Sequence, residues 1–389
     1  MPWKETDVVN LRTEFILRVF EDKLPFGELC REYGISRKTG YKWKERFLKQ
    51  GIDGLADRSR RPRASPNQVD EETVCRIVRL KMAHPSWGPR KIQHVFARSY
   101  PNAELPSESS FKRVLDKAGL VKHRKRRCQQ DSGRIENRIE AERSNQVWTV
   151  DFKGWWRTGD RQRFEPLTVR DAFSRYILCA QALVNCRTET VRAEFERVFT
   201  KHGLPEVIRS DNGSPFAAYQ SPLGLSRLSA WWLALGIDLD RIAPGRPDQN
   251  GSHERMHRDI ALELEADSAD DFRIQQAELD DWRETYNHER PHEAIGMRIP
   301  GDLYRDSDRR FDSGEIALEY PLEYLRRRVG CKGVIRFQNI HVGVSESLAG
   351  WDVGLQPSRR NRYDLWFCRL RLGEVDLETR KFYAITKGT

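Results

Sequence analysis

Hydrophobic and polar positions follow three different patterns along the chain. From residue 8 to about residue 121 apolar side chains recur every three or four positions, which is the spacing of amphipathic helices. From about residue 146 short β-branched runs alternate with amphipathic helical segments. After residue 301 short strand-like runs lie between Gly-, Ser- and Asn-rich turns. With 389 residues the chain exceeds a usual single domain, so we expect several domains: helical, then mixed α/β, then all-β.

The first helical stretch predicts a helix-turn-helix. Two amphipathic segments, residues 8–20 and 24–34, precede a third helix over residues 37–51 that Ser36 can cap. Gly40 inside this third helix costs about 1 kcal/mol relative to alanine. A short turn between two such helices presents a recognition helix to the DNA major groove. The candidate DNA contacts near the start of that helix are Arg37, Lys38, Thr39, Lys42 and Lys44.

Residues 69–121 repeat the three-helix pattern. A first helix is stopped by Pro85, a second covers residues 88–100, and a third is capped by Ser107 and ended by Gly119. Two such modules on one chain would bind a long DNA site. The candidate DNA contacts of the second module are Ser109, Ser110, Lys112 and Arg113.

Positive charge is concentrated in this helical part. Residues 1–145 hold 32 Lys and Arg against 20 Asp and Glu, whereas the rest of the chain holds 36 against 38. Such an imbalance suits a polyphosphate partner. Two segments without core-forming residues carry much of it, and each is either a phosphate-contacting arm or a solvated tether. Their candidate DNA contacts are Arg58, Arg60, Arg61 and Arg63 in the first segment, and Arg124, Lys125, Arg126 and Arg127 in the second.

Three acidic residues in the middle of the chain stand where strands end and a helix begins. Asp151 ends a first strand, and two further strands and a helix follow it. A fourth strand then breaks at Asp211, beside Asn212 and Gly213. A turn at Asn250 and Gly251 starts the helix that carries Glu254. This order of strands, helices and acids is that of an RNase H-like fold.

Three clustered carboxylates suit metal-dependent phosphodiester chemistry. Cleavage of a phosphodiester develops negative charge on the attacking and the leaving oxygen, and two divalent ions can stabilise both. Mg²⁺ prefers hard oxygen ligands, so carboxylates are its natural holders. Without metal the three acids repel one another, which raises some of their pKa values. We therefore expect Asp151, Asp211 and Glu254 to bind two ions of Mg²⁺, or of Mn²⁺, and to be the catalytic residues.

Five ordered motifs carry a family resemblance. WTVDFKG, VRDAFSRY, RSDNGSPF, PGRPDQNGSHERMHR and YNHERPHEAIG resemble those of insertion-sequence transposases of the retroviral-integrase superfamily, most of all insertion-sequence family 481. The resemblance implies cleavage at the 3′ ends of a mobile element, then strand transfer by the freed 3′-OH. Asp151, Asp211 and Glu254 match the three acids, while Asn212, Gly213, Asn250 and Gly251 would shape the site. Asp171 also matches a family position, but we expect it to cap a hairpin turn.

The chain departs from the better-known integrases in two ways. The stretch of 42 residues between Asp211 and Glu254 is longer, and the zinc-binding N-terminal module is replaced by the helix-turn-helix pair. His253 to His257 also spells HExxH, the motif of zinc proteases. In those proteases the helix normally extends upstream of the first histidine, whereas Pro and Gly precede His253 here. We therefore expect these histidines to lie on a helix surface near nucleic acid.

Taken together, these patterns predict a multidomain protein: all-α helix-turn-helix modules, an α/β RNase H-like catalytic core and a small all-β SH3-like barrel at the C-terminus. The predicted segments are 1–57, the first helix-turn-helix domain; 58–68, a basic linker; 69–128, the second helix-turn-helix domain; 129–145, a linker; 146–300, the catalytic core; and 301–389, the barrel. Seven scattered cysteines without a CxxC pair support neither a disulfide framework nor a zinc ribbon.

The predicted function is DNA transposition by metal-dependent cleavage and strand transfer. The predicted partners are the element's terminal inverted repeats and target DNA, with the protein acting as a homodimer or larger assembly. With no membrane span or signal peptide evident, a cytoplasmic, nucleoid-associated location is expected. A domesticated repressor would share the DNA-binding half but would need no intact triad of acids. A non-transposing nuclease would share the triad but would need no pair of site-reading modules.

Overall fold

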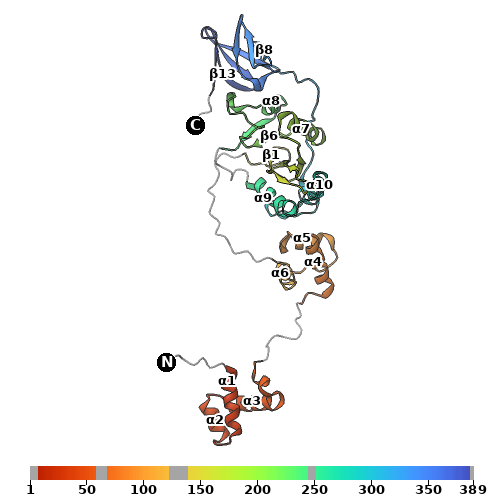
Figure 1. Cartoon of the computed structure of the whole chain (residues 1–389), viewed down its shortest axis with the longest axis vertical. Helices are drawn as coiled ribbons and strands as arrows, with labels where there is room; N and C mark the ends of the chain where they lie inside the picture. Colours follow the sequence, from red (N-terminus) through yellow and green to blue (C-terminus); the bar gives the residue numbers. More distant parts are fainter. Residues whose placement is uncertain (1–7, 58–67, 122–138, 244–250, 386–389) are drawn as a thin grey trace. The chain divides into compact units, whose positions relative to one another are not determined.

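The computed structural model describes residues 8–57, 68–121, 139–243 and 251–385 (Figure 1). The chain divides into two compact units, Met1–Val69 and Asp70–Thr389. None of the helices in the described ranges is both long and apolar enough to cross a membrane. Nine of the predicted site residues lie outside the described residues: Arg58, Arg60, Arg61, Arg63, Arg124, Lys125, Arg126, Arg127 and Asn250.

The first unit contains the predicted three helices. These are α1 (Val8–Phe20), α2 (Phe26–Glu32) and α3 (Arg37–Gln50), followed by a 3-10 turn, η1 (Gly51–Leu55). The Ser36 hydroxyl accepts a hydrogen bond from the backbone N–H of Thr39 at 3.2 Å, which confirms the predicted cap of α3. The helices enclose a core of Phe15, Ile16, Leu29, Cys30, Trp43 and Leu55.

Gly40 has a packing role that the sequence did not reveal. It lies in the middle of α3 and is buried against α2. A Cβ atom at this position would lie 2.7 Å from Cys30 Sγ and 3.0 Å from the Phe26 ring. The glycine therefore offsets its low helix propensity by allowing α2 and α3 to approach closely.

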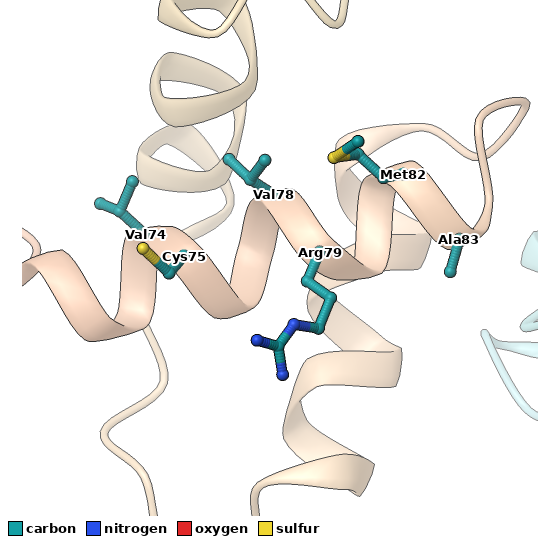
Figure 2. A pocket seen from close by; sticks show the side chains of 6 residues that line it. All are labelled: Val74, Cys75, Val78, Arg79, Met82 and Ala83. Atoms are coloured by element: carbon teal, nitrogen blue, oxygen red, sulfur yellow. The ribbon is translucent and has the colours of Figure 1, made fainter.

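The second three-helix domain consists of α4 (Glu71–Ala83), α5 (Pro89–Ser99) and α6 (Glu108–Lys117). Ser107 caps α6, as predicted, by accepting from the N–H of Ser110 at 3.3 Å. Its core is Ile77, Trp87, Ile92, Phe96, Phe111 and Leu115. The outward side of α4 retains a shallow, largely apolar hollow (Figure 2), which is lined by Val74, Cys75, Val78, Arg79, Met82 and Ala83.

A mixed five-stranded sheet forms the centre of the second unit. Its strands are β1 (Val147–Phe152), β4 (Pro166–Asp171), β5 (Ile177–Ala182), β6 (Val207–Ser210) and β7 (Asp238–Arg241). Their order is β5-β4-β1-β6-β7, with β5, β4 and β1 antiparallel and β1, β6 and β7 parallel. A small hairpin that the sequence did not predict, β2 (Trp156–Arg157) with β3 (Arg163–Phe164), interrupts the chain between β1 and β4.

Helices cover the sheet on both faces. One face packs against α7 (Thr188–His202) and α8 (Arg227–Ala234), through a core that includes Trp148, Phe199 and Trp232. The other packs against α9 (Gly251–Ile260), the π-helical turn η4 (Ala261–Glu265) and α10 (Phe272–His288). Short turns η2 (Pro222–Gly224) and η5 (Glu293–Ile295) and the helix α11 (Pro300–Leu303) complete this part.

The C-terminal part is all-β, as predicted. A five-stranded sheet has the order β14-β13-β12-β11-β8, beside a hairpin of β9 and β10. Leu225, Ala230 and Leu233 of the α8 region join its core, so it packs on the central α/β part. The SH3-like shape and the boundary at residue 300 stay predictions. The bounds are β8 (Leu325–Arg328), β9 (Val334–Phe337), β10 (Ile340–Gly343), η6 (Glu346–Leu348), β11 (Asp352–Arg359), β12 (Arg362–Phe367), β13 (Leu370–Asp376) and β14 (Lys381–Ala384).

Gly40→Ala tests the close packing of α2 and α3. Alanine gains about 1 kcal/mol in helix propensity, but crowding in a packed core costs about 1–3 kcal/mol. We expect a net loss of stability confined to the first unit, seen as faster amide hydrogen exchange in α2 and α3. Lys38→Ala, on the exposed side of the same helix, is the control. Slower exchange in Gly40→Ala than in the wild type would show that the gain in helix propensity outweighs any crowding between α2 and α3.

Candidate active site

Strand pairing brings the first two acids together. β1 and β6 are parallel, and their register pairs Val147 with Val207 and Thr149 with Arg209. Continuing this register by two residues places Asp151 beside Asp211, where both parallel strands reach their carboxyl ends. Asp151 is the second-last residue of β1, and 24% of its side chain is exposed. Asp211 is exposed in the turn that follows β6.

The third acid stands on a helix that is fastened to the same sheet. Glu254 is exposed in the first turn of α9. The guanidinium of Arg170, on β4, donates to the Ser252 carbonyl oxygen at 2.7 Å and to the Ser252 hydroxyl at 2.8 Å. Met256 and Ile260 are buried on the side of α9 that faces the sheet. These contacts hold the start of α9, and hence Glu254, over β1 and β4.

The two histidines of α9 are buried anchors, and the expectation that they lie on the helix surface is wrong. His253 is fully buried, and its two ring nitrogens lie 2.9 Å from Thr149 Oγ1 and 2.7 Å from Thr168 Oγ1. His257 Nε2 lies 2.8 Å from the same Thr168 hydroxyl. With these nitrogens engaged by threonine, the histidines do not form the metal-binding pair that the HExxH spelling suggests.

Burial and neighbouring charge act together on Asp151. Burial is the largest cause that raises the pKa of its carboxyl, and the charges of Asp211 and Glu254 add to it, so that the pKa reaches about 7. A hydrogen bond from the Phe152 backbone opposes this rise. The three predicted acids therefore interact electrostatically, which is the coupling that the sequence led us to expect.

The nearby imidazoles are neutral. Burial lowers the pKa of His257 to about 3, assisted by the positive charges of Arg170 and Lys153. Burial also places the pKa of His253 well below its usual value. Neither ring therefore supplies the positive charge that would stabilise an ionised Asp151 at neutral pH.

A divalent cation would supply that charge. The donor set of two aspartates and one glutamate suits a hard, oxygen-preferring ion, and ionised Asp151 would gain from a cation beside it. Across the ranges that the structure describes, no group of three or more His, Cys, Asp or Glu side chains is arranged to hold a metal ion. The residue types thus fit a divalent metal, while the positions of the three acids do not by themselves enclose one.

The residues predicted to shape the site have local structural contacts. The Gly213 N–H donates to Asp211 Oδ1 at 3.0 Å, and Asn212 Nδ2 donates to the Ile242 carbonyl oxygen at 2.6 Å. Gly251 is the first residue of α9. Asp171 caps the β4–β5 turn, as predicted, because its Oδ2 accepts from the N–H of Ser174 at 2.8 Å.

Most described DNA-contact candidates are exposed, but Ser110 is not. Its side chain is buried, and its hydroxyl bonds to Ser107 Oγ at 3.0 Å and accepts from the Arg113 guanidinium at 3.1 Å. Ser110 belongs to the cap of α6, so the prediction that it faces DNA is wrong. Thr39 is likewise engaged in a cap, with its hydroxyl 2.9 Å from Ser36 Oγ. Lys44 is partly buried, and the exposed candidates are Arg37, Lys38, Lys42, Ser109, Lys112 and Arg113.

Three polar residues at the site escaped the sequence interpretation: Thr149, Thr168 and Arg170. All three are buried on strands β1 and β4 and bond to α9. A signal was present, because Thr168 and Arg170 alternate with Leu167 and Val169 in a strand whose every residue is buried. Polar side chains recurring on one face of a buried strand indicate specific partners.

Comparison with protein families identifies domains in both parts. A helix-turn-helix domain model matches residues 11–63, and a homeodomain-like domain model matches residues 39–115. Models of the integrase core domain match residues 141–247 and 235–300. The three acids and the α9 anchors therefore lie within the matched integrase core.

Among curated proteins, the chain is similar to products of insertion elements. It is 25% identical over 254 residues to the insertion element IS476 uncharacterized 39.2 kDa protein of Xanthomonas euvesicatoria, which covers 64% of this chain and 69% of that protein. It is also 25% identical over 241 residues to the insertion element IS407 uncharacterized 31.7 kDa protein of Burkholderia multivorans, covering 62% and 83%.

Solved structures similar to the chain include retroviral integrase cores. The catalytic core domain of BIV integrase aligns with 41% of this chain and 93% of its own, at 22% identity and a TM-score of 0.32. The HTLV-2 integrase catalytic core domain in complex with magnesium aligns with 42% and 96%, at 12% identity and a TM-score of 0.30. The family models and the curated relatives together show that this chain combines helix-turn-helix domains with an integrase core domain and is a relative of insertion-element proteins.

Proposed function

We propose that this protein is a transposase of an insertion sequence, of the family 481 type, which cleaves the 3′ ends of its element and joins them to target DNA. Asp151, Asp211 and Glu254 are the proposed catalytic residues and metal ligands. The observation that carries the proposal is the raised pKa of Asp151, which the two other acids help to raise from separate elements. The match to integrase core models over the same residues supports it.

The proposed chemistry uses the charge of the three acids. Divalent metal, Mg²⁺ or Mn²⁺ and two ions per site, would stabilise the attacking and leaving oxygens and lower the pKa of the attacking water or hydroxyl. The carboxylates of Asp151, Asp211 and Glu254 would hold it. The Gly213 N–H fixes one oxygen of Asp211, which leaves the other available as a ligand. The Arg170–Ser252 bonds keep the Glu254 helix over the sheet.

DNA recognition is assigned to the helical modules. The exposed basic residues at the start of α3 and along α6 would contact the terminal inverted repeats, together with the basic segments around residues 58–63 and 124–127. Because two element ends must be cut and joined together, we propose a dimer or larger assembly on DNA. The all-β C-terminal part, which we propose to be SH3-like, would bind DNA or hold subunits together.

The alternative function is a DNA-binding repressor without catalysis. It would need the helix-turn-helix domains but not three acids that influence one another at one sheet edge. A cleavage assay on a DNA fragment carrying the element's end separates the two functions directly. Metal-dependent nicking at the 3′ end is expected for the transposase, and binding without nicking for the repressor.

Asp151→Asn, Asp211→Asn and Glu254→Gln should each abolish cleavage while leaving binding of the element end nearly intact. Each amide keeps the side-chain shape but removes the charge that holds the metal, so transition-state stabilisation falls by several kcal/mol, at least about a hundredfold in rate. Nicking of a labelled end with Mg²⁺ or Mn²⁺, beside a gel shift on the same DNA, measures both effects. Glu189→Gln, at the exposed start of α7, is the control. Normal cutting by Asp151→Asn would show that the triad is misassigned.

Without metal, Asp151→Asn should also stabilise the protein as pH rises. The folded-state pKa of Asp151 is about 7, above its unfolded value, so folding binds a proton and ionisation in the folded state costs stability between about pH 4 and pH 7. The asparagine variant lacks this cost. With a chelator present, thermal unfolding should show a free energy of unfolding only slightly higher than that of the wild type near pH 4. At pH 8 the difference should exceed about 1 kcal/mol, since one pKa unit is about 1.4 kcal/mol. An advantage independent of pH would contradict the raised pKa.

Alanine at Arg37, Lys38 and Lys42 should weaken binding of the element's end. Contacts to bases would cost about 1–3 kcal/mol each and relax specificity, whereas phosphate contacts would weaken all sequences alike and reduce the salt dependence of binding. Equilibrium binding of the full chain to end and random duplexes over a range of salt concentrations separates these effects. Unchanged affinity of the triple variant would show that α3 is not a recognition helix.

A further inference from the structure

A single buried hydroxyl joins the strand of the first acid to the helix of the third. Thr168 lies on β4, opposite Asp151 in the antiparallel pairing with β1. Its Oγ1 lies 2.9 Å from the carbonyl oxygen of Asp151, 2.7 Å from His253 Nε2 and 2.8 Å from His257 Nε2. Thr168 and His253 are fully buried, so the bond between them is shielded from solvent, while the His257 side chain is 12% exposed.

Because the Thr168 hydroxyl has a single proton, the donor in each of its three hydrogen bonds can be assigned. A hydroxyl has one proton and two lone pairs, and a carbonyl oxygen can only accept. All three contacts are satisfied together only if Thr168 donates to Asp151 and both imidazoles donate Nε2–H to Thr168. The remaining nitrogen of His253, Nδ1, then faces Thr149 Oγ1 at 2.9 Å, and the single proton of that hydroxyl is shared between this nitrogen and the Arg170 carbonyl oxygen at 3.3 Å. The remaining nitrogen of His257, Nδ1, faces Asp151 Oδ2 at 4.0 Å.

These bonds restrain Glu254 in particular. His253 precedes Glu254 by one residue and His257 follows it by three, so the two bonded rings bracket the acid within one turn of α9. Burial of Met256 and Ile260 attaches the helix to the sheet, but apolar contact is non-directional and fixes its rotation and its sliding along the strands only loosely. Directional bonds to one fixed oxygen do restrain both.

We propose that Thr168 is a positioning residue for the cleavage reaction: its hydroxyl, through His253 and His257, sets the distance and orientation of Glu254 relative to Asp151, and so the ability of the three acids to share metal. This role rests on the proposed function of the triad. Loss of the hydroxyl would leave the sheet folded but remove two bonds to α9, which the Arg170–Ser252 bonds, the His253–Thr149 bond and apolar packing would then hold.

The test compares Thr168→Val, which keeps the side-chain shape without the hydroxyl, with Thr168→Ser, which keeps the hydroxyl. In the full chain, Thr168→Val should raise the Mg²⁺ concentration for half-maximal cleavage at least tenfold, with unchanged binding of the element's end. Thr168→Ser should stay within about threefold of the wild type. Amide hydrogen exchange over α9 should accelerate at least tenfold in Thr168→Val alone. The control is Thr200→Val, since Thr200 is exposed on α7 and bonds only within its helix.

The outcomes separate this inference from the proposed function. If the wild type does not cleave, the transposase proposal fails, yet faster exchange in α9 of Thr168→Val still supports the positioning role and unchanged exchange overturns it. If the wild type cleaves, an unaltered Mg²⁺ requirement in Thr168→Val overturns the role, as does an equal defect in Thr168→Ser. Should Thr168→Val fail to fold, His257→Ala removes one of the two rings and must raise the Mg²⁺ requirement in the same direction. If His257→Ala needs the same Mg²⁺ concentration for cleavage as the wild type, the inference is also overturned.

Discussion

The register of β1 between β4 and β6 is the constraint on which the candidate site depends. The parallel register with β6 carries Asp151 to the level of Asp211, and the antiparallel register with β4 places Thr168 opposite Asp151. A shift of one residue in β1 would turn Asp151 toward the opposite, apolar face of the sheet. That face is filled by Trp148 and Val150 packing against α7 and α8, so the hydrophobic core itself holds the acid in position.

The same arrangement carries an electrostatic cost. Partly buried Asp151 lies near two other acids and near imidazoles that remain neutral, so its ionised form is disfavoured in the isolated protein. Such a group gains most from a cation brought in as metal, while the positive charge of the protein lies in the N-terminal part. Under the proposed function the tasks are divided: the basic helical modules would supply affinity for polyphosphate, and the acidic sheet edge would carry the chemistry.

The sequence predicted the order of elements and the helix caps because these depend on local chemistry. Ser36, Ser107 and Asp171 each act within three residues of their partners, so short motifs were sufficient. The β2–β3 hairpin was missed because strands of two residues have no recognisable period. Ser110 was misassigned because its position on α6, next to buried Phe111, turns it toward the core rather than toward a DNA groove.

The anchoring of α9 could not be predicted from local patterns. Thr168 is separated by 85 residues from His253 and by 89 from His257, and no spacing rule links them. In the sequence the two histidines match the HExxH motif of zinc proteases. Only the tertiary structure, in which their ring nitrogens bond to threonine, argues against a zinc site. The three candidate acids could be picked out because strand ends and helix starts can be predicted from sequence. The long-range hydrogen bonds that orient the helix of Glu254 cannot.

The most direct test of the account is the location of bound Mn²⁺ in a crystal of the protein, from its anomalous scattering. We predict a peak within about 2.0–2.3 Å of carboxylate oxygens of Asp151 and Asp211, with Glu254 turned toward it when DNA is present. Asp151→Asn crystals should lose the peak. Mn²⁺ bound at His253 and His257, or a triad that binds no ion at millimolar Mn²⁺ with DNA present, would contradict the assignment of this sheet edge as the catalytic centre.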